Sequence, residues 1–230
     1  LTETQYLMSI SLSANTYYWR VVGRDIAGNY ETSSIYKIII DTTVIVQNIY
    51  PVNNTETNIQ NIKFVWSGTA NTWTLQITTN TNFINLTDTI TIYNTTSISV
   101  MIKTSGIYHW RIKGEDTYAN TAYSTNYKLY IDTAIDVKLL YPDDNILTNS
   151  LKIYFVWSGD ADTYNIIISS DTSFADTYII DSAVVGNNSN TFIVLPREGI
   201  YFWKIAGVDR VGNALVTSAR KIYIDTGIDF

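Results

Sequence analysis

The segment Gly106-Ile-Tyr-His-Trp-Arg-Ile-Lys-Gly-Glu-Asp116 recurs in this chain as Gly199-Ile-Tyr-Phe-Trp-Lys-Ile-Ala-Gly-Val-Asp209. In both copies, large apolar residues occupy every second position, and the positions between them include charged residues. A period of two indicates a β-strand with one buried face. A third version, Asn15-Thr-Tyr-Tyr-Trp-Arg-Val-Val-Gly-Arg-Asp25, lies near the start of the chain. The same strand is therefore predicted three times.

The three copies mark a long repeat. Trp19, Trp110 and Trp203 are 91 and 93 residues apart, and Phe-Val-Trp-Ser-Gly recurs from Phe64 and Phe155, 91 residues apart. This period is too long for a solenoid repeat and matches one small domain. The chain of 230 residues is thus predicted to be a tandem array of small domains.

Each repeat is predicted to be a β-sandwich. In the second repeat, seven segments of period-two alternation are separated by Asn, Gly, Ser, Thr and Asp: 44–50, 61–67, 72–79, 89–93, 97–102, 107–114 and 127–131. Seven short strands with frequent turn signals indicate two packed sheets, and no stretch has a helical period with caps. The expected fold class is all-β, a tandem of seven-stranded sandwiches.

The predicted domains are two complete repeats, 44–133 and 134–230, and an incomplete C-terminal half repeat, 1–43. The half repeat contains expected strands at 6–10, 17–23 and 35–40, without the strand that carries Phe-Val-Trp-Ser-Gly. A half sandwich leaves an apolar face and unpaired edges open to water. Either the chain is cut from a longer array, or a partner chain supplies the missing strands by strand addition.

The positions of the aromatic residues carry a family resemblance. The second strand has Trp66 or Trp157, the third has Trp73 or Tyr164, and the sixth reads Tyr-x-Trp-x-(Val/Ile)-x-Gly-x-Asp. This pattern, with the hairpin Asp-x-x-Gly-Asn and the closing Ile-Asp-Thr, resembles fibronectin type III-like and immunoglobulin-like modules of prokaryotic cell-surface and secreted proteins. The resemblance implies an extracellular or cell-surface location. It leaves function open among spacers, adhesins, assembly modules and enzyme accessories. In the middle repeat, Ala119 stands at the position where the other two hairpins have glycine.

Composition excludes several classes of function. The net charge of −6 disfavours nucleic-acid binding, and the absence of Cys excludes disulfides, thiolate metal sites and a cysteine nucleophile. His109, the only histidine, is expected on an outer face beside Arg111, where the sequence predicts no partners for a hydrolytic triad or a histidine-rich metal site. No apolar run is long enough to cross a bilayer. We expect a protein that is not an enzyme, has no resident cofactor and does not insert into membranes.

Aromatic residues in a β-protein also invite a sugar-binding hypothesis. All six tryptophans occupy inward positions of their expected strands and are predicted to be core residues. Tyr18, Tyr118 and Tyr123 are expected at the surface, where they could contact glycans.

Two kinds of binding or modification site are predicted from loops. Several carboxylates would gather at the junction of the second and third repeats, where oxygen ligands suit Ca²⁺: Asp132, Asp136, Asp160, Asp162 and Asp209. The alternative is that these are solvated acids that form turns. Four Asn-x-Ser/Thr sequons lie in expected loops, at Asn53, Asn85, Asn94 and Asn187, about the number that chance gives in a chain this rich in Asn, Ser and Thr.

The linkers are the strongest indication of function. Asp41-Thr-Thr43 leads directly into Val44, and Asp132-Thr-Ala134 into Ile135, without a Gly/Ser-rich or Pro-rich spacer. We expect neighbouring domains to touch, so that the array forms a semi-rigid, elongated rod. The strand edges carry few charges, so pairing with copies of the chain or with neighbouring modules is not blocked.

The resulting hypothesis is a non-enzymatic structural segment of an extracellular prokaryotic surface protein. It would act as a self-associating spacer in a surface layer, filament, sheath or adhesin stalk. The alternative is an accessory or binding region of a larger secreted enzyme that acts on polysaccharide.

Overall fold

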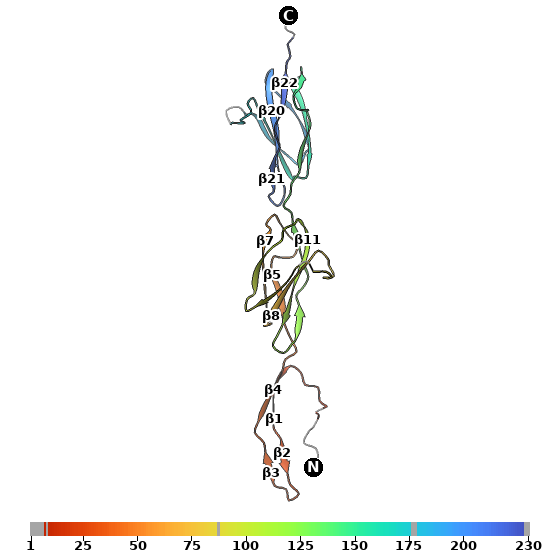
Figure 1. The fold of residues 1–230 in the computed structure, drawn as a ribbon, viewed down its shortest axis with the longest axis vertical. Coiled ribbons are helices and arrows are strands. Elements are labelled where there is room, and N and C mark those ends of the chain that lie inside the picture. Colours follow the sequence, from red (N-terminus) through yellow and green to blue (C-terminus); the bar gives the residue numbers. More distant parts are fainter. Residues whose placement is uncertain (1–6, 8, 87, 176–178, 228–230) are drawn as a thin grey trace. The chain divides into compact units, whose positions relative to one another are not determined.

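The computed structural model describes residues 7, 9–86, 88–175 and 179–227, and all regular secondary structure in these ranges is β-strand (Figure 1). Its residues form two compact units. One contains Leu1–Thr55, Asn61–Met101 and Ile107–Leu129, and the other contains Glu56–Gln60, Ile102–Gly106 and Tyr130–Phe230. Because the boundary between these units cuts through three strands, the sheets are described below by their hydrogen bonding.

The first segment consists of two small antiparallel sheets. Strand β1 (Asn15–Trp19) pairs with β4 (Tyr36–Ile40), and β2 (Val22–Arg24) pairs with β3 (Tyr30–Thr32). The single strand expected over 17–23 is therefore interrupted.

The strand expected over 6–10 is wrong for residues 7, 9 and 10, while residues 6 and 8 lie outside the described residues. The equivalent strand of the middle repeat is β10 (Ser97–Met101), which pairs with β7 (Asn61–Gly68). The first segment has no counterpart of β7 among the described residues, so no ladder forms there.

The middle sandwich contains strands β5 to β13. Besides β7 and β10, these are β5 Val46–Tyr50, β6 Thr55–Thr57, β8 Thr72–Thr78, β9 Asp88–Tyr93, β11 Gly106–Glu115, β12 Thr121–Tyr123 and β13 Tyr127–Ile131. One sheet has the order β10-β7-β5, and the other has the order β6-β13-β11-β8-β9 with β12 paired to β11.

The C-terminal sandwich repeats this arrangement with strands β14 to β22. They are β14 Val137–Tyr141, β15 Ile146–Thr148, β16 Lys152–Gly159, β17 Thr163–Ser169, β18 Ile179–Gly186, β19 Asn190–Val194, β20 Gly199–Val208, β21 Ala214–Val216 and β22 Arg220–Ile224. The sheet orders are β14-β16-β19 and β15-β22-β20-β17-β18, with β21 paired to β20. Strand β15 lies parallel to β22.

The prediction of an all-β tandem of sandwiches is confirmed, but each sandwich has nine described strands rather than seven. The first strand of each repeat divides, because the chain leaves one sheet near Pro51 or Pro142 and joins the other. The short strands β12 and β21 account for the ninth. The predicted domain limits and the rod-like arrangement remain predictions.

Five of the six tryptophans lie in the cores, as predicted. Trp66, Trp73, Trp110, Trp157 and Trp203 are each at most 3% exposed. Phe64 on β7 meets Trp110 on β11 edge-on, with ring centroids 5.0 Å apart, so this contact joins the two sheets. The prediction is wrong for Trp19, which is 50% exposed because no described sheet covers it.

The glycine of the repeated strand permits a close approach between the sheets. A Cβ atom on Gly207 would lie 2.7 Å from Val137 Cγ2 and 3.0 Å from Ala161 Cβ. In the middle sandwich, a Cβ on Gly114 would lie 2.8 Å from atoms of Val46 and Ala70. Only glycine fits at these positions without displacing its neighbours.

Candidate functional site

The hairpin Asp-x-x-Gly-Asn has the same internal hydrogen bonds in each repeat. Asp209 Oδ1 accepts from the backbone nitrogen of Asn213 at 2.8 Å, and Asp209 Oδ2 accepts from Asn213 Nδ2 at 2.7 Å. The pairs Asp25–Asn29 and Asp116–Asn120 make the same two bonds at 2.8–2.9 Å. The aspartate thus fixes the orientation of the asparagine side chain.

The turn requires a left-handed residue one position before this asparagine. Gly28 and Gly212 have φ values of 92° and 91°, and Ala119 has a φ of 63°. An alanine in this region costs about 1 kcal/mol more than glycine. The middle repeat keeps the hairpin despite this departure, because Asp116 still accepts both bonds from Asn120.

The oriented asparagine binds the linker that precedes its own sandwich. Asn120 Nδ2 donates to the carbonyl oxygen of Asp41 at 3.0 Å. Asn213 Nδ2 donates to the carbonyl oxygens of Asp132 and Ala134 at 3.1 and 3.3 Å. Both linkers are therefore bound by equivalent hairpins. We call each such hairpin, with its bond to the linker, a linker clamp.

The linker aspartates also shape the linker itself. Asp41 Oδ1 accepts from the backbone nitrogen of Thr43 at 3.1 Å, and Asp132 Oδ1 accepts from that of Ala134 at 3.2 Å. These are Asx turns, in which a short polar side chain replaces a backbone partner. The recurring Ile-Asp-Thr therefore ends a strand and turns the chain toward the clamp.

Hydrogen bonding lowers the pKa of the hairpin aspartates. The side chain of Asn120 holds the pKa of Asp116 below its ordinary value, and Asn29 does the same for Asp25. Burial raises the pKa of Asp209, but the bonds from Asn213 and from backbone nitrogens outweigh it, and the net shift is downward. The charged carboxylate is thus the form that the hairpin stabilises.

The carboxylates expected to form a calcium site are used for other contacts. Asp209 belongs to the hairpin, and Asp132 to the Asx turn. Asp160 Oδ1 accepts from the backbone nitrogen of Asp136 at 2.7 Å, and Asp136 forms an ion pair with Lys138.

Asp162, the fifth predicted ligand, is exposed. Among the described residues, no three acidic or histidine side chains lie close enough together to hold a metal ion. Calcium binding at this junction remains a prediction, and the contacts favour the alternative that these acids form turns.

The four predicted glycosylation sites lie in exposed turns or bends outside the strands: Asn53, Asn85, Asn94 and Asn187. The side chain of Asn53 is already engaged, since its Oδ1 accepts from the backbone nitrogen of Lys128 at 2.8 Å. Glycosylation remains a prediction at all four.

The tyrosines considered for glycan contact are exposed, as expected: Tyr18 (69%), Tyr118 (56%) and Tyr123 (50%). The ring of Tyr123 packs against the Arg111 guanidinium, 4.2 Å from the ring centroid, and Phe83 covers the same guanidinium at 4.1 Å. Tyr123 is therefore part of a stacked cation–π group. Glycan contact by the tyrosines remains a prediction.

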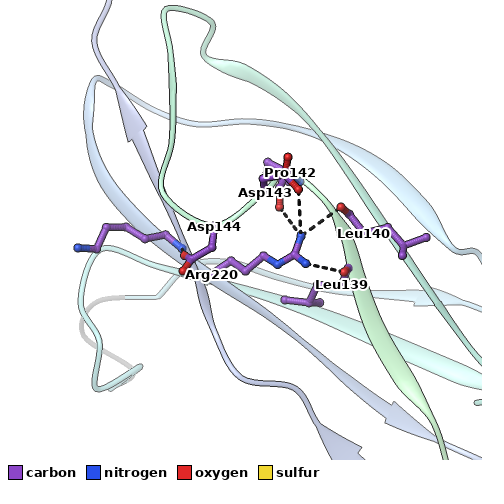
Figure 2. A network of polar contacts seen from close by, with 7 residues as sticks. Leu139, Leu140, Pro142, Asp143, Asp144 and Arg220 are labelled. Atoms are coloured by element: carbon purple, nitrogen blue, oxygen red, sulfur yellow. Dashed lines mark hydrogen bonds and ion pairs between the residues drawn. The ribbon is translucent and has the colours of Figure 1, made fainter.

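Arg220 binds the chain where the first strand of the C-terminal sandwich leaves its sheet (Figure 2). Its Nη1 donates to the carbonyl oxygens of Leu140 and Pro142 at 3.1 and 2.8 Å, and its Nη2 donates to that of Leu139 at 2.8 Å. The pairing of β14 with β16 shifts register here. Carbonyl groups that leave a ladder need other donors, and the guanidinium supplies them.

The middle sandwich has Tyr127 at the position of Arg220, packed edge-on against Trp110 with ring centroids 5.6 Å apart. The arginine contact is therefore not part of the repeat. It stabilises one sandwich, whereas the linker clamp occurs at both linkers.

The described residues contain no helix that could span a membrane. The chain matches no protein-family model and no curated protein sequence. Among solved structures it is similar to the fibronectin(III)-like modules of CbhA from Clostridium thermocellum, with 12% identity, a TM-score of 0.37 and coverage of 79% of this chain and 94% of that one. It is also similar to the FN1–FN3 domains of chicken CNTN1, with 12% identity, a TM-score of 0.36 and coverage of 91% and 75%. The structural neighbours of this chain are thus fibronectin type III-like modules, a likeness of fold alone.

Proposed function

We propose that this chain is a non-enzymatic spacer segment of an extracellular prokaryotic surface protein, such as a surface layer, filament, sheath or adhesin stalk. Its task is to hold successive β-sandwiches at restricted angles and to associate with copies of itself. The observation that carries the proposal is the linker clamp, in which Asn120 and Asn213 bind the carbonyls of the linkers that precede their sandwiches.

The length and the bonding of the linkers both restrict their motion. A linker of a few residues whose carbonyls are bound to the following sandwich loses most of its backbone freedom. A Gly/Ser-rich linker of the same length would keep that freedom. The asparagine is held by two bonds to its aspartate, so little side-chain entropy is lost when it binds the linker.

The absence of cysteine from the sequence makes a direct test simple. Thr96 and Ser189 are exposed and lie outside the strands of the middle and C-terminal sandwiches. Replacing both with cysteine allows two spin labels to be attached. Pulsed electron–electron double resonance then gives the distribution of distances between the labels. We expect one narrow distribution in the otherwise unchanged chain and a broad one in Asn213→Ala.

The matched control is Asn29→Ala. Asn29 belongs to the same kind of hairpin, but within the described residues its side chain donates to its own aspartate and to no linker carbonyl. This variant should leave the distance distribution unchanged. A distribution that is already broad with Asn213 in place would contradict the proposed restriction.

Self-association has a separate test, electron microscopy of the native particle. Ordered sheets or filaments built from these repeats would support the spacer proposal. Particles that stay single and bind insoluble polysaccharide would instead support the accessory region of a larger secreted enzyme.

A further inference from the structure

The first segment presents an apolar face that no sheet covers in the part of the chain that the structure describes. Trp19 is stacked on Tyr36, with ring centroids 5.0 Å apart and an interplanar angle of 25°. Both rings are about half exposed, and Ile38 on the same sheet is 46% exposed. Large contiguous apolar surfaces of this kind mark interaction sites.

The same positions are buried in both complete sandwiches. Trp110 and Trp203, which occupy the position of Trp19, are 0% exposed, and so are Leu129 and Ile222, which occupy the position of Ile38. In each case the three-stranded sheet of the sandwich provides the cover. Both complete sandwiches therefore show that a three-stranded sheet of this type packs against this face.

The contact with this cover is nearly identical in the two complete repeats. Phe64 meets Trp110 with ring centroids 5.0 Å apart at 71°, and Phe155 meets Trp203 at 5.0 Å and 67°. Both phenylalanines belong to the strand that reads Phe-Val-Trp-Ser-Gly. Trp19 has the matching ring, but among the described residues no phenylalanine packs against it.

The open segment already has the local structure of a complete repeat. The Tyr17 hydroxyl donates to the carbonyl of Ser13 at 3.1 Å, as the Tyr201 hydroxyl donates to that of Arg197 at 2.8 Å. This tyrosine corner is typical of immunoglobulin-like sandwiches. The clamp hairpin is formed as well, with Asn29 held by Asp25. The surface is thus preorganised, which lowers the cost of binding.

We propose that this face binds the N-terminal half of a repeat of this same type. The partner is a three-stranded antiparallel sheet whose central strand carries Phe-x-Trp, like β7 and β16. Its phenylalanine packs edge-on against Trp19, and the carbonyl ahead of its first strand accepts a hydrogen bond from Asn29. This surface is separate from the linker clamps of the proposed function and can be tested independently of them.

The test supplies such a half repeat to the full chain. In the chimera, a copy of residues 41–105 replaces residues 1–14, because Ser105 precedes the repeated strand as Ala14 does. Trp19 is the one tryptophan that is not buried, and all six lie within the described residues, so quenching of tryptophan fluorescence by iodide reports on Trp19. We expect the quenchable fraction of the chimera to fall to that of Trp19→Phe in the unchanged chain.

A matched control carries Phe64→Asp in the added copy only, where it would place a carboxylate against Trp19 and leave the ring quenchable. A second graft, a copy of residues 132–198 in the same place, guards against poor folding of the first. The proposal is overturned if Trp19 stays quenchable in both grafts. It is also overturned if Trp19 is already shielded in the unchanged chain by pairing of two copies, seen as a dimer by sedimentation that Trp19→Asp abolishes.

Discussion

Strands β1 and β4 of the first segment and strands β20 and β22 of the C-terminal sandwich follow the same sequence pattern, yet they differ in burial. Trp203 is 0% exposed and Trp19 is 50% exposed, although both follow a tyrosine corner and face the same way in their repeats. The registers also agree, since Trp19 lies opposite Tyr36 and Trp203 lies opposite Arg220. Strand pairing and turns are thus set locally, whereas burial depends on the second sheet.

The largest expected effect is a difference in the free energy of unfolding between variants of the two tryptophans. Trp203→Ala should lower the free energy of unfolding of the C-terminal sandwich by about 3–5 kcal/mol, because it leaves a cavity in the core. Trp19→Ala should change it by less than about 0.5 kcal/mol, as is usual for exposed positions away from the folded core. Urea denaturation followed by circular dichroism checks both, and equal effects would contradict the comparison.

A second effect concerns the residue opposite each tryptophan. Arg220→Ala leaves three carbonyl groups without their donor and should destabilise the C-terminal sandwich by about 1.5–3 kcal/mol. Arg220→Lys should restore only part of this, because an ammonium lacks the planar fork. Tyr36→Ala, the equivalent change in the first segment, should leave the main unfolding transition in place. Thermal unfolding distinguishes the three variants.

A third effect compares equivalent glycines. Gly207→Ala places a methyl group 2.7 Å from Val137 and should destabilise its sandwich by about 1–3 kcal/mol through overpacking. Gly23→Ala meets no atom within 4 Å and should have almost no effect. If Gly23→Ala were as costly as Gly207→Ala, then the first segment would be covered in solution by something that the described residues do not include.

The smallest effect is one that all the repeats share. The pKa of Asp116 is held below its usual 3.8 by Asn120, so the hairpin's contribution to stability is present above that pH and is lost as pH falls through the lowered pKa. Carbon-13 NMR of the carboxyl groups should show a midpoint below 3.8 for Asp116. Asn120→Ala should raise that midpoint. An unchanged midpoint would show that the hydrogen bond from Asn120 is not what lowers the pKa of Asp116.

Much of the fold could be predicted from sequence because period-two alternation and turn residues are local signals. Trp19 is an example. The strand period predicts which face of its strand Trp19 occupies, but the exposure of its side chain depends on residues far away in the sequence. The same limit applies to the clamp. Asp209 and Asn213 could be recognised as a hairpin, but the bond from Asn213 to Asp132 joins residues 81 positions apart. No local pattern specifies such a contact.

The carboxylates of the predicted calcium site, which remains a prediction, also make contacts that the sequence does not reveal. The strand order predicts that Asp132, Asp160 and Asp209 lie at one end of the fold, and in the structure each carboxylate accepts a backbone hydrogen bond nearby. Short acidic side chains in loops serve turns more often than metals. The recurrence of Asp with Asn at the same spacing in all three repeats was the signal that pointed to the hairpin's role.

The hairpin asparagines Asn120 and Asn213 bind the linkers that precede their sandwiches, and we propose that these bonds make the linkers rigid. Nitrogen-15 relaxation of the amides of Thr43 and Ala134 tests it most directly. We expect backbone order parameters of about 0.85, as in rigid strands, that fall below about 0.6 at Thr43 in Asn120→Ala and at Ala134 in Asn213→Ala. Values below about 0.6 at both linkers in the unchanged protein would show that the clamps do not hold the linkers rigid.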